Sequence, residues 1–266
     1  MQNQKFGRFT ETVSVLWLVF YGLLTALHFS KLMTALPGKF NFSFTFLLLG
    51  GMILFAATSA GRAQPSLRDG ALAAVIGGFL LFTMTRTLSP GLVSSFAVGS
   101  VLLLMGTWLT AALGREVVSS TYIWPLLIVV TCFDLWSVFS SHGITQQIVL
   151  SGDSPKEILN LLVLEVPIPA IGLSPILGIG DVLFLGFIAG AVEQLQLEWR
   201  RYFIGTMLGF GACLVTLLIL EIPVPALVFI APAIGLSLGR SVLTTAREVL
   251  MAIGFVASLL VVRSLL

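Results

Sequence analysis

Two aspartates, Asp134 and Asp181, lie inside apolar stretches of the sequence, where an ionised side chain is costly. A lone carboxylate in hydrocarbon costs at least about 2.5–3.5 kcal/mol. Neither stretch contains a Lys or Arg that could pair with the acid. Two carboxylates held close together cannot both ionise easily, so one of them keeps its proton at neutral pH. Such a pair can do acid–base chemistry: one carboxylate takes a proton from water while the protonated one polarises a carbonyl.

The composition predicts that this chemistry takes place in a lipid bilayer. Of the 266 residues, 57% are hydrophobic and only 10% are charged, whereas a soluble domain is usually about 25% charged. We therefore expect an all-α polytopic membrane protein, because the apolar stretches are too long for the strands of a membrane barrel. The net charge of +2 is small and scattered, so a nucleic-acid partner is not expected.

The apolar stretches predict about nine transmembrane helices, with a short strand-like segment before the helix of the second acid. The expected spans are 12–30, 42–60, 70–87, 92–113, 120–140, 175–193, 203–221, 223–240 and 246–264. We expect three parts: an N-terminal transmembrane bundle (1–119), a catalytic transmembrane core (120–240) and an additional C-terminal helix (241–266).

The basic residues predict how the chain is oriented in the membrane. Nine of the 14 Lys and Arg residues fall on the side of the N-terminus, which favours a cytoplasmic N-terminus. The long connection 141–174 then faces outward. The small size and short loops favour the plasma membrane of a prokaryote.

The connection 141–174 contains one apolar run, Ile158 to Ile168, that is too short to cross a bilayer. Its β-branched residues and closing prolines predict a short strand or a surface helix. Strand edges are not tolerated facing lipid, so the run must be buried, paired or at the interface. Residues 161–166 are expected to pair with an unwound substrate peptide as an added strand. Glu165 is expected to be a solvated edge residue.

Each acid belongs to a distinctive local sequence. Asp134 directly follows Phe133, and Asp181 closes the sequence Gly178-Ile179-Gly180-Asp181. These glycines are expected to let another backbone approach closely. A third segment, Pro223-Val224-Pro225-Ala226-Leu227, opens the eighth span, and its prolines prevent a regular helix start. The alternative interpretation of each acid is a helix cap or a contact with water near the end of a span.

In this order, the three segments resemble the motifs of the presenilin and signal peptide peptidase family of intramembrane aspartyl proteases. The resemblance covers roughly 120–240, and the stretches 176–191 and 201–232 are more similar to signal peptide peptidase and its archaeal relatives than to animal presenilin. It implies an aspartic endopeptidase, without metal or cofactor, that cleaves transmembrane helical peptides or signal peptides. Asp134 and Asp181 would be its catalytic pair. The residues implied to line the site and place the substrate are Phe133, Gly178, Gly180, Pro225, Ala226 and Leu227.

The chain departs from the family pattern at three points. Phe133 stands where the family commonly has Tyr, which keeps the ring but removes a hydroxyl. The family usually places its first Asp in the sixth span and Pro-Ala-Leu in the ninth; here they fall in the fifth and eighth, with one span added at the C-terminus. The long loop that animal presenilins cut during maturation is absent, so a single uncut chain is expected.

Two other functions would also use acids in the membrane. A prepilin-type peptidase carries Gly-x-Gly-Asp, but it does not predict Pro-Ala-Leu two spans later. A basic residue often follows its Asp, where this chain has Val182-Leu183-Phe184. A transporter could bind cations or protons at Asp134 and Asp181, but it predicts internal repeats, and none is evident in the sequence.

Small residues in the C-terminal third predict close helix packing. Gly205 and Gly209 form a G-x-x-x-G pair. The stretch from Gly235 to Gly239 fits the serine-hydrolase elbow pattern, but the His base and the strand–turn–helix context are missing. A metal site is not expected either, because His-Glu-x-x-His is absent and both cysteines lie in apolar runs.

Overall fold

The computed structural model describes residues 2–29, 37–89, 91–139, 163–220 and 225–242, together with Thr245, Arg247, Leu250 and Gly254. The chain divides into two compact units. The first unit comprises Met1–Glu116 and Ser154–Gln194, and the second comprises Val117–Asp153 and Leu195–Leu266. Each unit is thus built from two separate stretches of sequence. The predicted parts 1–119, 120–240 and 241–266 were defined by their expected functions and not by compactness. That division stays a prediction.

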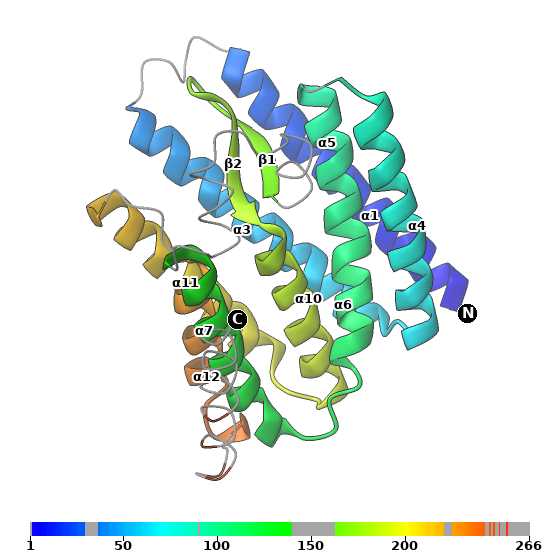
Figure 1. The fold of residues 1–266 in the computed structure, drawn as a ribbon, viewed down its shortest axis with the longest axis vertical. Helices are drawn as coiled ribbons and strands as arrows, with labels where there is room; N and C mark the ends of the chain where they lie inside the picture. Colours follow the sequence, from blue (N-terminus) through cyan, green and yellow to red (C-terminus); the bar gives the residue numbers. More distant parts are fainter. Residues whose placement is uncertain are drawn as a thin grey trace, which may run out of the picture. The chain divides into compact units, whose positions relative to one another are not determined.

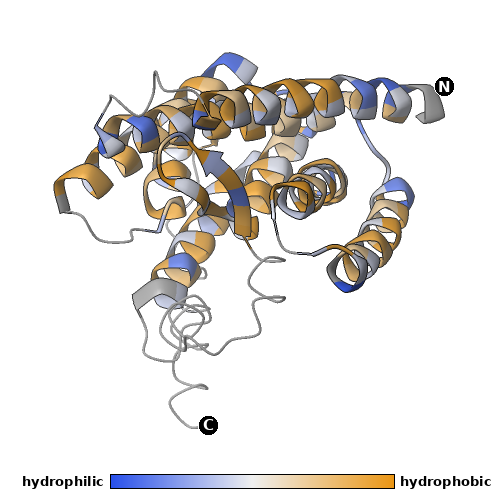
Figure 2. Ribbon diagram, turned by 90° about the horizontal axis from the view of Figure 1, so that it is seen from above, coloured by the Kyte–Doolittle hydropathy of each residue, from blue (hydrophilic) through white to orange (hydrophobic). Residues whose placement is uncertain are grey.

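Six helices in the described part of the chain are long and apolar enough to cross a membrane. They are Lys5–Phe29, Gly38–Ala63, Leu67–Met84, Leu92–Gly114, Ser120–Ser137 and Trp199–Ile219. Hydrophobic residues predominate along the helices (Figure 2). A mainly helical chain is therefore confirmed, and the six long apolar helices indicate a membrane-embedded protein. They correspond to six of the predicted spans.

Nine transmembrane helices are not confirmed. The predicted sixth span, 175–193, begins in a strand, and its helix, Ile179–Gln194, has 16 residues. In the predicted eighth span, 223–240, the helix has only 12 residues. It runs from Leu227 to Leu238, and Gly239 follows it with a φ of +57°, in the left-handed region. The ninth span, 246–264, lies outside the described residues except for three scattered positions.

The first unit consists of helices and one hairpin (Figure 1). Its helices are α1 (Gln2–Phe29), α3 (Gly38–Ala63), α4 (Leu67–Thr87), α5 (Leu92–Val101), α6 (Thr107–Gly114) and α10 (Ile179–Gln194). A π-helical turn, Leu102–Gly106, joins α5 to α6. Helix α10 packs against α3 and α6. Glycines permit this contact, because a Cβ on Gly190 would lie 2.1 Å from the carbonyl oxygen of Ala111.

The hairpin consists of β1 (Val163–Ile168) and β2 (Gly172–Gly178), which pair antiparallel. Its short turn uses positive φ angles at Ala170 (64°) and Gly172 (115°). Leu164 and Val166 of β1 are fully buried. The short strand expected before α10 is therefore confirmed, and it is both paired and buried. Strand β2 was not expected, because it was assigned in part to a transmembrane helix.

The second unit contains α7 (Ile123–Phe139), α11 (Trp199–Leu220) and α12 (Leu227–Leu238), with 3-10 turns at Ser120–Tyr122 and Gly239–Val242. Helix α12 packs against α7 and α11. The predicted packing role of Gly205 and Gly209 is confirmed, since added Cβ atoms would lie 2.8 and 2.5 Å from the backbone of α12.

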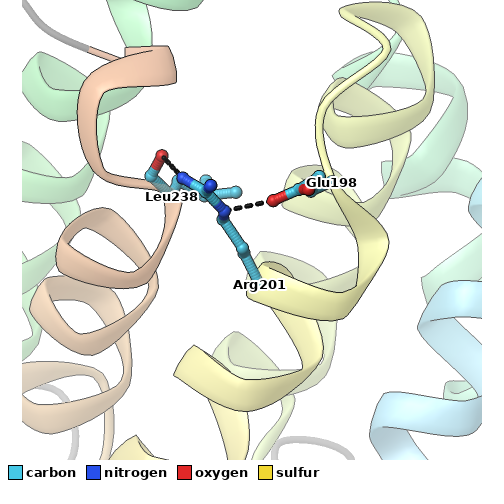
Figure 3. Close-up of polar contacts among 3 residues, drawn as sticks. All are labelled: Glu198, Arg201 and Leu238. Atoms are coloured by element: carbon cyan, nitrogen blue, oxygen red, sulfur yellow. Dashed lines mark hydrogen bonds and ion pairs between the residues drawn. The ribbon is translucent and has the colours of Figure 1, made fainter.

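A polar contact also ties the start of α11 to the end of α12 (Figure 3). The guanidinium of Arg201 forms an ion pair with Glu198, and its Nη1 atom lies 3.5 Å from the carbonyl oxygen of Leu238. The last carbonyls of a helix lack intrahelical partners, so a cation there is favourable. Because both charged side chains are partly exposed, we expect only a small contribution to stability.

Candidate functional site

Asp134 lies on α7 of the second unit and reaches the first residue of α12. The backbone N–H of Leu227 donates a hydrogen bond of 3.0 Å to Oδ2 of Asp134. Leu227 opens α12, directly after Ala226. The first N–H groups of a helix have no partner within the helix, and the helix dipole favours a negative charge there. Asp134 is therefore held at the N-terminus of the helix that begins with Pro-Ala-Leu.

Asp181 is held in a similar way in the first unit. It is the third residue of α10 and is 8% exposed. The backbone N–H of Gly178, the last residue of β2, donates a hydrogen bond of 3.1 Å to its Oδ2 atom. This is the contact that an acid at the third helical position makes in a capping box. The strand-to-helix junction thus fixes the orientation of the Asp181 carboxylate.

The two acids share one arrangement, although they belong to different units. Each carboxylate accepts a hydrogen bond from a backbone N–H at the start of a helix. The donor is Leu227 for Asp134 in the second unit and Gly178 for Asp181 in the first. Such charge-assisted hydrogen bonds stabilise an ionised carboxylate and fix its plane. The contacts are also those of helix caps, so the alternative interpretation of each acid agrees with this geometry.

The other residues implied to line the site differ in their surroundings. Pro225 and Ala226 are buried beside Leu227. Phe133 is 55% exposed, and its ring packs against Trp136 with 5.5 Å between the centroids. Gly180 is exposed in the first turn of α10. Residues Pro223 and Val224 lie outside the described residues.

The close approach of another backbone to the Gly-x-Gly-Asp glycines is not observed within the described part of the first unit. A Cβ built on Gly178 has the Asp181 carboxylate as its nearest neighbour, at 3.6 Å. A Cβ built on Gly180 meets no atom within 4 Å. Within this unit, the role of Gly178 is therefore the backbone N–H that it supplies to Asp181.

The expectation that Glu165 is a solvated edge residue is met only in part. Glu165 is half-buried in β1, and Oγ of Ser95 on α5 donates a hydrogen bond of 2.7 Å to its Oε2 atom. Ser95 itself is 8% exposed. The signal that could have indicated a partner is a single acid within a strand whose neighbours, Leu164 and Val166, are apolar. Its partner on α5 could not be named, because it lies 70 residues earlier in the chain.

No family model, curated protein or solved structure matches the chain. The functional interpretation therefore depends on the order of the three sequence segments and on the contacts of the two acids. Within the second unit, the structure brings Asp134 together with Leu227. Within the first, it brings Asp181 together with Gly178.

Proposed function

We propose that the chain is an intramembrane aspartyl endopeptidase that cleaves peptide bonds within transmembrane helices. Asp134 and Asp181 form the catalytic pair and share one proton. The ionised carboxylate takes a proton from water, the resulting hydroxide attacks the scissile carbonyl carbon, and the protonated acid donates its proton to the carbonyl oxygen. The tetrahedral intermediate then collapses and its C–N bond breaks. The leaving amine receives the proton taken from water, and a hydroxyl proton of the intermediate passes to the other carboxylate, which restores the shared proton. The substrates are transmembrane helical peptides, including signal peptides, and the membrane is the plasma membrane of a prokaryote.

One contact supports this proposal most strongly: the hydrogen bond from the Leu227 N–H to Asp134. The order of motifs predicted that Pro-Ala-Leu lies beside the catalytic acids. The two residues are 93 positions apart in the sequence, so their contact is not a consequence of local chain geometry. A donor fixed in the backbone holds a carboxylate in place without a side chain that must reorganise during the reaction.

A backbone change can test the Leu227 donor without altering any side chain. Replacing Leu227 by its α-hydroxy acid converts the N–H into an ester oxygen and should lower kcat about tenfold to a hundredfold, as for a lost hydrogen bond to a charged group. The matched control is the same change at Phe229, whose N–H donates to the carbonyl oxygen of Ala226 at 3.1 Å in the same turn. Equal losses from both esters would argue against a role for the Leu227 donor in catalysis.

The hairpin supports one mode of substrate binding, in which the unwound peptide adds a strand to the sheet. A peptide bond in a helix is shielded, because its carbonyl already accepts a hydrogen bond, so the substrate must unwind before attack. Strand β2 ends at Gly178, three residues before Asp181. An unwound peptide that joins this sheet as an added strand would be directed towards Asp181.

This mode of presentation is best tested by changing the substrate. Replacing residues 161–166 by a Gly/Ser run would also delete Leu164 and Val166, which are fully buried, so that variant would lose stability as well. N-methylation of single substrate residues near the cleaved bond removes one backbone donor at a time. Only alternate donors face one neighbouring strand, so kcat/KM should fall about tenfold at every second position.

Faster cleavage of the N-methylated substrates would argue against strand addition. N-methylation also weakens the substrate helix, so it should speed cleavage at every position if unwinding alone limits the reaction. A uniform increase without a two-residue period would contradict strand addition. N-methylation outside the transmembrane segment of the substrate is the control, and it should leave kcat/KM unchanged.

A further inference from the structure

Glu165 has no part in the proposed chemistry, yet it joins two elements of the first unit. It lies on β1, and it accepts the 2.7 Å hydrogen bond from Ser95 of α5. A hydrogen bond to a carboxylate is roughly twice as strong as one between neutral groups. The contact therefore fixes the middle of β1 to α5 at one defined point.

The hairpin is irregular at this point. Glu165 is paired with Pro175, whereas Leu164 is paired with Leu177, so the register shifts between Leu164 and Glu165. Proline has no N–H and cannot donate to the strand ladder. Pairing alone therefore holds the two strands weakly at the bulge, and a contact from outside the sheet can decide the register.

The neighbouring packing also positions β1 against α5. Gly99 lies one turn after Ser95, and a Cβ on Gly99 would lie 2.9 Å from the Trp17 ring and 3.6 Å from the Leu164 side chain. At the far end of β1, the Nδ1 atom of His28 lies 3.2 Å from the carbonyl oxygen of Ile168. Helices α1 and α5 thus hold β1 from outside the sheet.

We propose that Glu165 is a positioning residue for Asp181. By binding Ser95, Glu165 fixes how β1 and β2 pair between the bulge and Gly178, the segment that precedes Asp181. There, Val163 is paired with Gly178, and the Gly178 N–H binds the Asp181 carboxylate at 3.1 Å. A shift in register would displace this N–H and turn the carboxylate. The inference rests on the proposed function as far as catalysis is concerned, but the coupling of Glu165 to Gly178 can be measured without it.

The test compares Glu165→Ala, Glu165→Gln and Ser95→Ala in the full-length protein. Ser100→Ala is the matched control, because among the described residues its hydroxyl bonds to the Phe96 carbonyl of its own helix, at 2.7 Å, and not to β1. Two quantities are measured: kcat and KM for a helical reporter substrate, and the hydrogen-exchange rate of the Gly178 amide.

We expect Glu165→Ala and Ser95→Ala each to lower kcat about tenfold or more with little change in KM, as for a displaced catalytic group. Both should also speed exchange at Gly178. Glu165→Gln, which keeps an acceptor but loses the charge, should fall between these variants and the native protein. The double variant should be no worse than Glu165→Ala, because the two residues act through one contact.

Several results would overturn the inference. One is a Gly178 exchange rate that stays native in all variants, and another is a kcat equally affected by Ser95→Ala and Ser100→Ala. If Glu165→Ala does not fold, Ser95→Ala and Glu165→Gln carry the same prediction. If the native protein cleaves no helical substrate, the proposed function fails, and exchange at Gly178 alone decides whether Glu165 positions the junction.

Discussion

Replacing Asp134 or Asp181 by Asn, each alone, should abolish cleavage of a helical reporter substrate. We expect kcat to fall at least about a thousandfold, because an amide can neither take a proton from water nor donate one as an acid. The fold should survive, since an Asn side-chain oxygen can still accept the N–H of Leu227 or Gly178 that binds the native acid. Cleavage by purified protein in liposomes and thermal unfolding together measure both effects.

Asp69 offers a matched control for the capping interpretation. It is the third residue of α4, and its carboxylate accepts a 3.0 Å hydrogen bond from the N–H of Ser66 in a capping box. It therefore occupies the same position in its helix as Asp181 does in α10. Asp69→Asn should leave cleavage intact. A loss of stability without a specific loss of activity in all three variants would indicate that the acids are only helix caps.

The pair also predicts the pH dependence of cleavage. Activity should fall at high pH, when the shared proton is lost, and at low pH, when the carboxylate that acts as the base is protonated.

A transporter would behave differently in the Asp134→Asn and Asp181→Asn variants. If cleavage persists in Asp134→Asn and Asp181→Asn while ion uptake collapses, the transporter hypothesis replaces the protease.

Replacing Gly190 by Ala should destabilise the first unit strongly. The added Cβ would lie 2.1 Å from the carbonyl oxygen of Ala111, so backbone must move and α10 must separate from α6. Overpacking of this kind typically costs about 1–3 kcal/mol, and the backbone contact places this variant at the upper end. Unfolding by detergent titration measures the loss.

Gly51 is the matched control for this prediction. It lies within α3, which belongs to the same unit, and a Cβ there meets no atom within 4 Å. Gly51→Ala should raise the free energy of unfolding by about 0.5–1 kcal/mol, because alanine loses less backbone entropy in a helix. Equal effects of Gly190→Ala and Gly51→Ala would contradict the packing of α10 on α6.

The sequence predicted long helices better than short elements. Six spans could be located because each is a long apolar stretch between polar residues or prolines. Residues 172–178 were partly misassigned, since a short apolar run does not distinguish a buried strand from a helix by its period. Tertiary pairing decides the matter: the chain turns at Gly172 with a φ of 115°, and the residues from Gly172 to Gly178 then pair with β1. Pro175 does not distinguish the two structures, because proline is tolerated at the first position of a helix.

The candidate site was predictable in its residue types and in the expected nearness of Pro-Ala-Leu, but not in its individual hydrogen bonds. The rarity of acids in apolar stretches singled out Asp134 and Asp181, because that cost follows from composition alone. Each acid accepts a hydrogen bond from a backbone N–H, that of Leu227 or that of Gly178. A helix cap was the alternative interpretation of each acid, but only the fold shows which N–H group is the donor. The bond between Glu165 and Ser95 was missed for a similar reason, since the two residues are distant in the sequence and only the tertiary fold brings them together.

The most direct test of the central claim is a chemical bridge between the two acidic positions. Asp134→Cys and Asp181→Cys would be combined in a chain whose two cysteines, Cys132 and Cys213, are replaced by Ala. Two thiols can be joined directly only if their Cα atoms lie within about 7 Å, and a thiol reagent with a single methylene extends this reach slightly. The control pairs position 134 with Phe187→Cys, about 9 Å further along α10.

If Asp134 and Asp181 form one catalytic pair, the 134–181 thiols should bridge rapidly in the folded protein, and the 134–187 thiols should not. No bridge between 134 and 181 in folded protein, with both thiols reactive toward a soluble reagent, would contradict the claim.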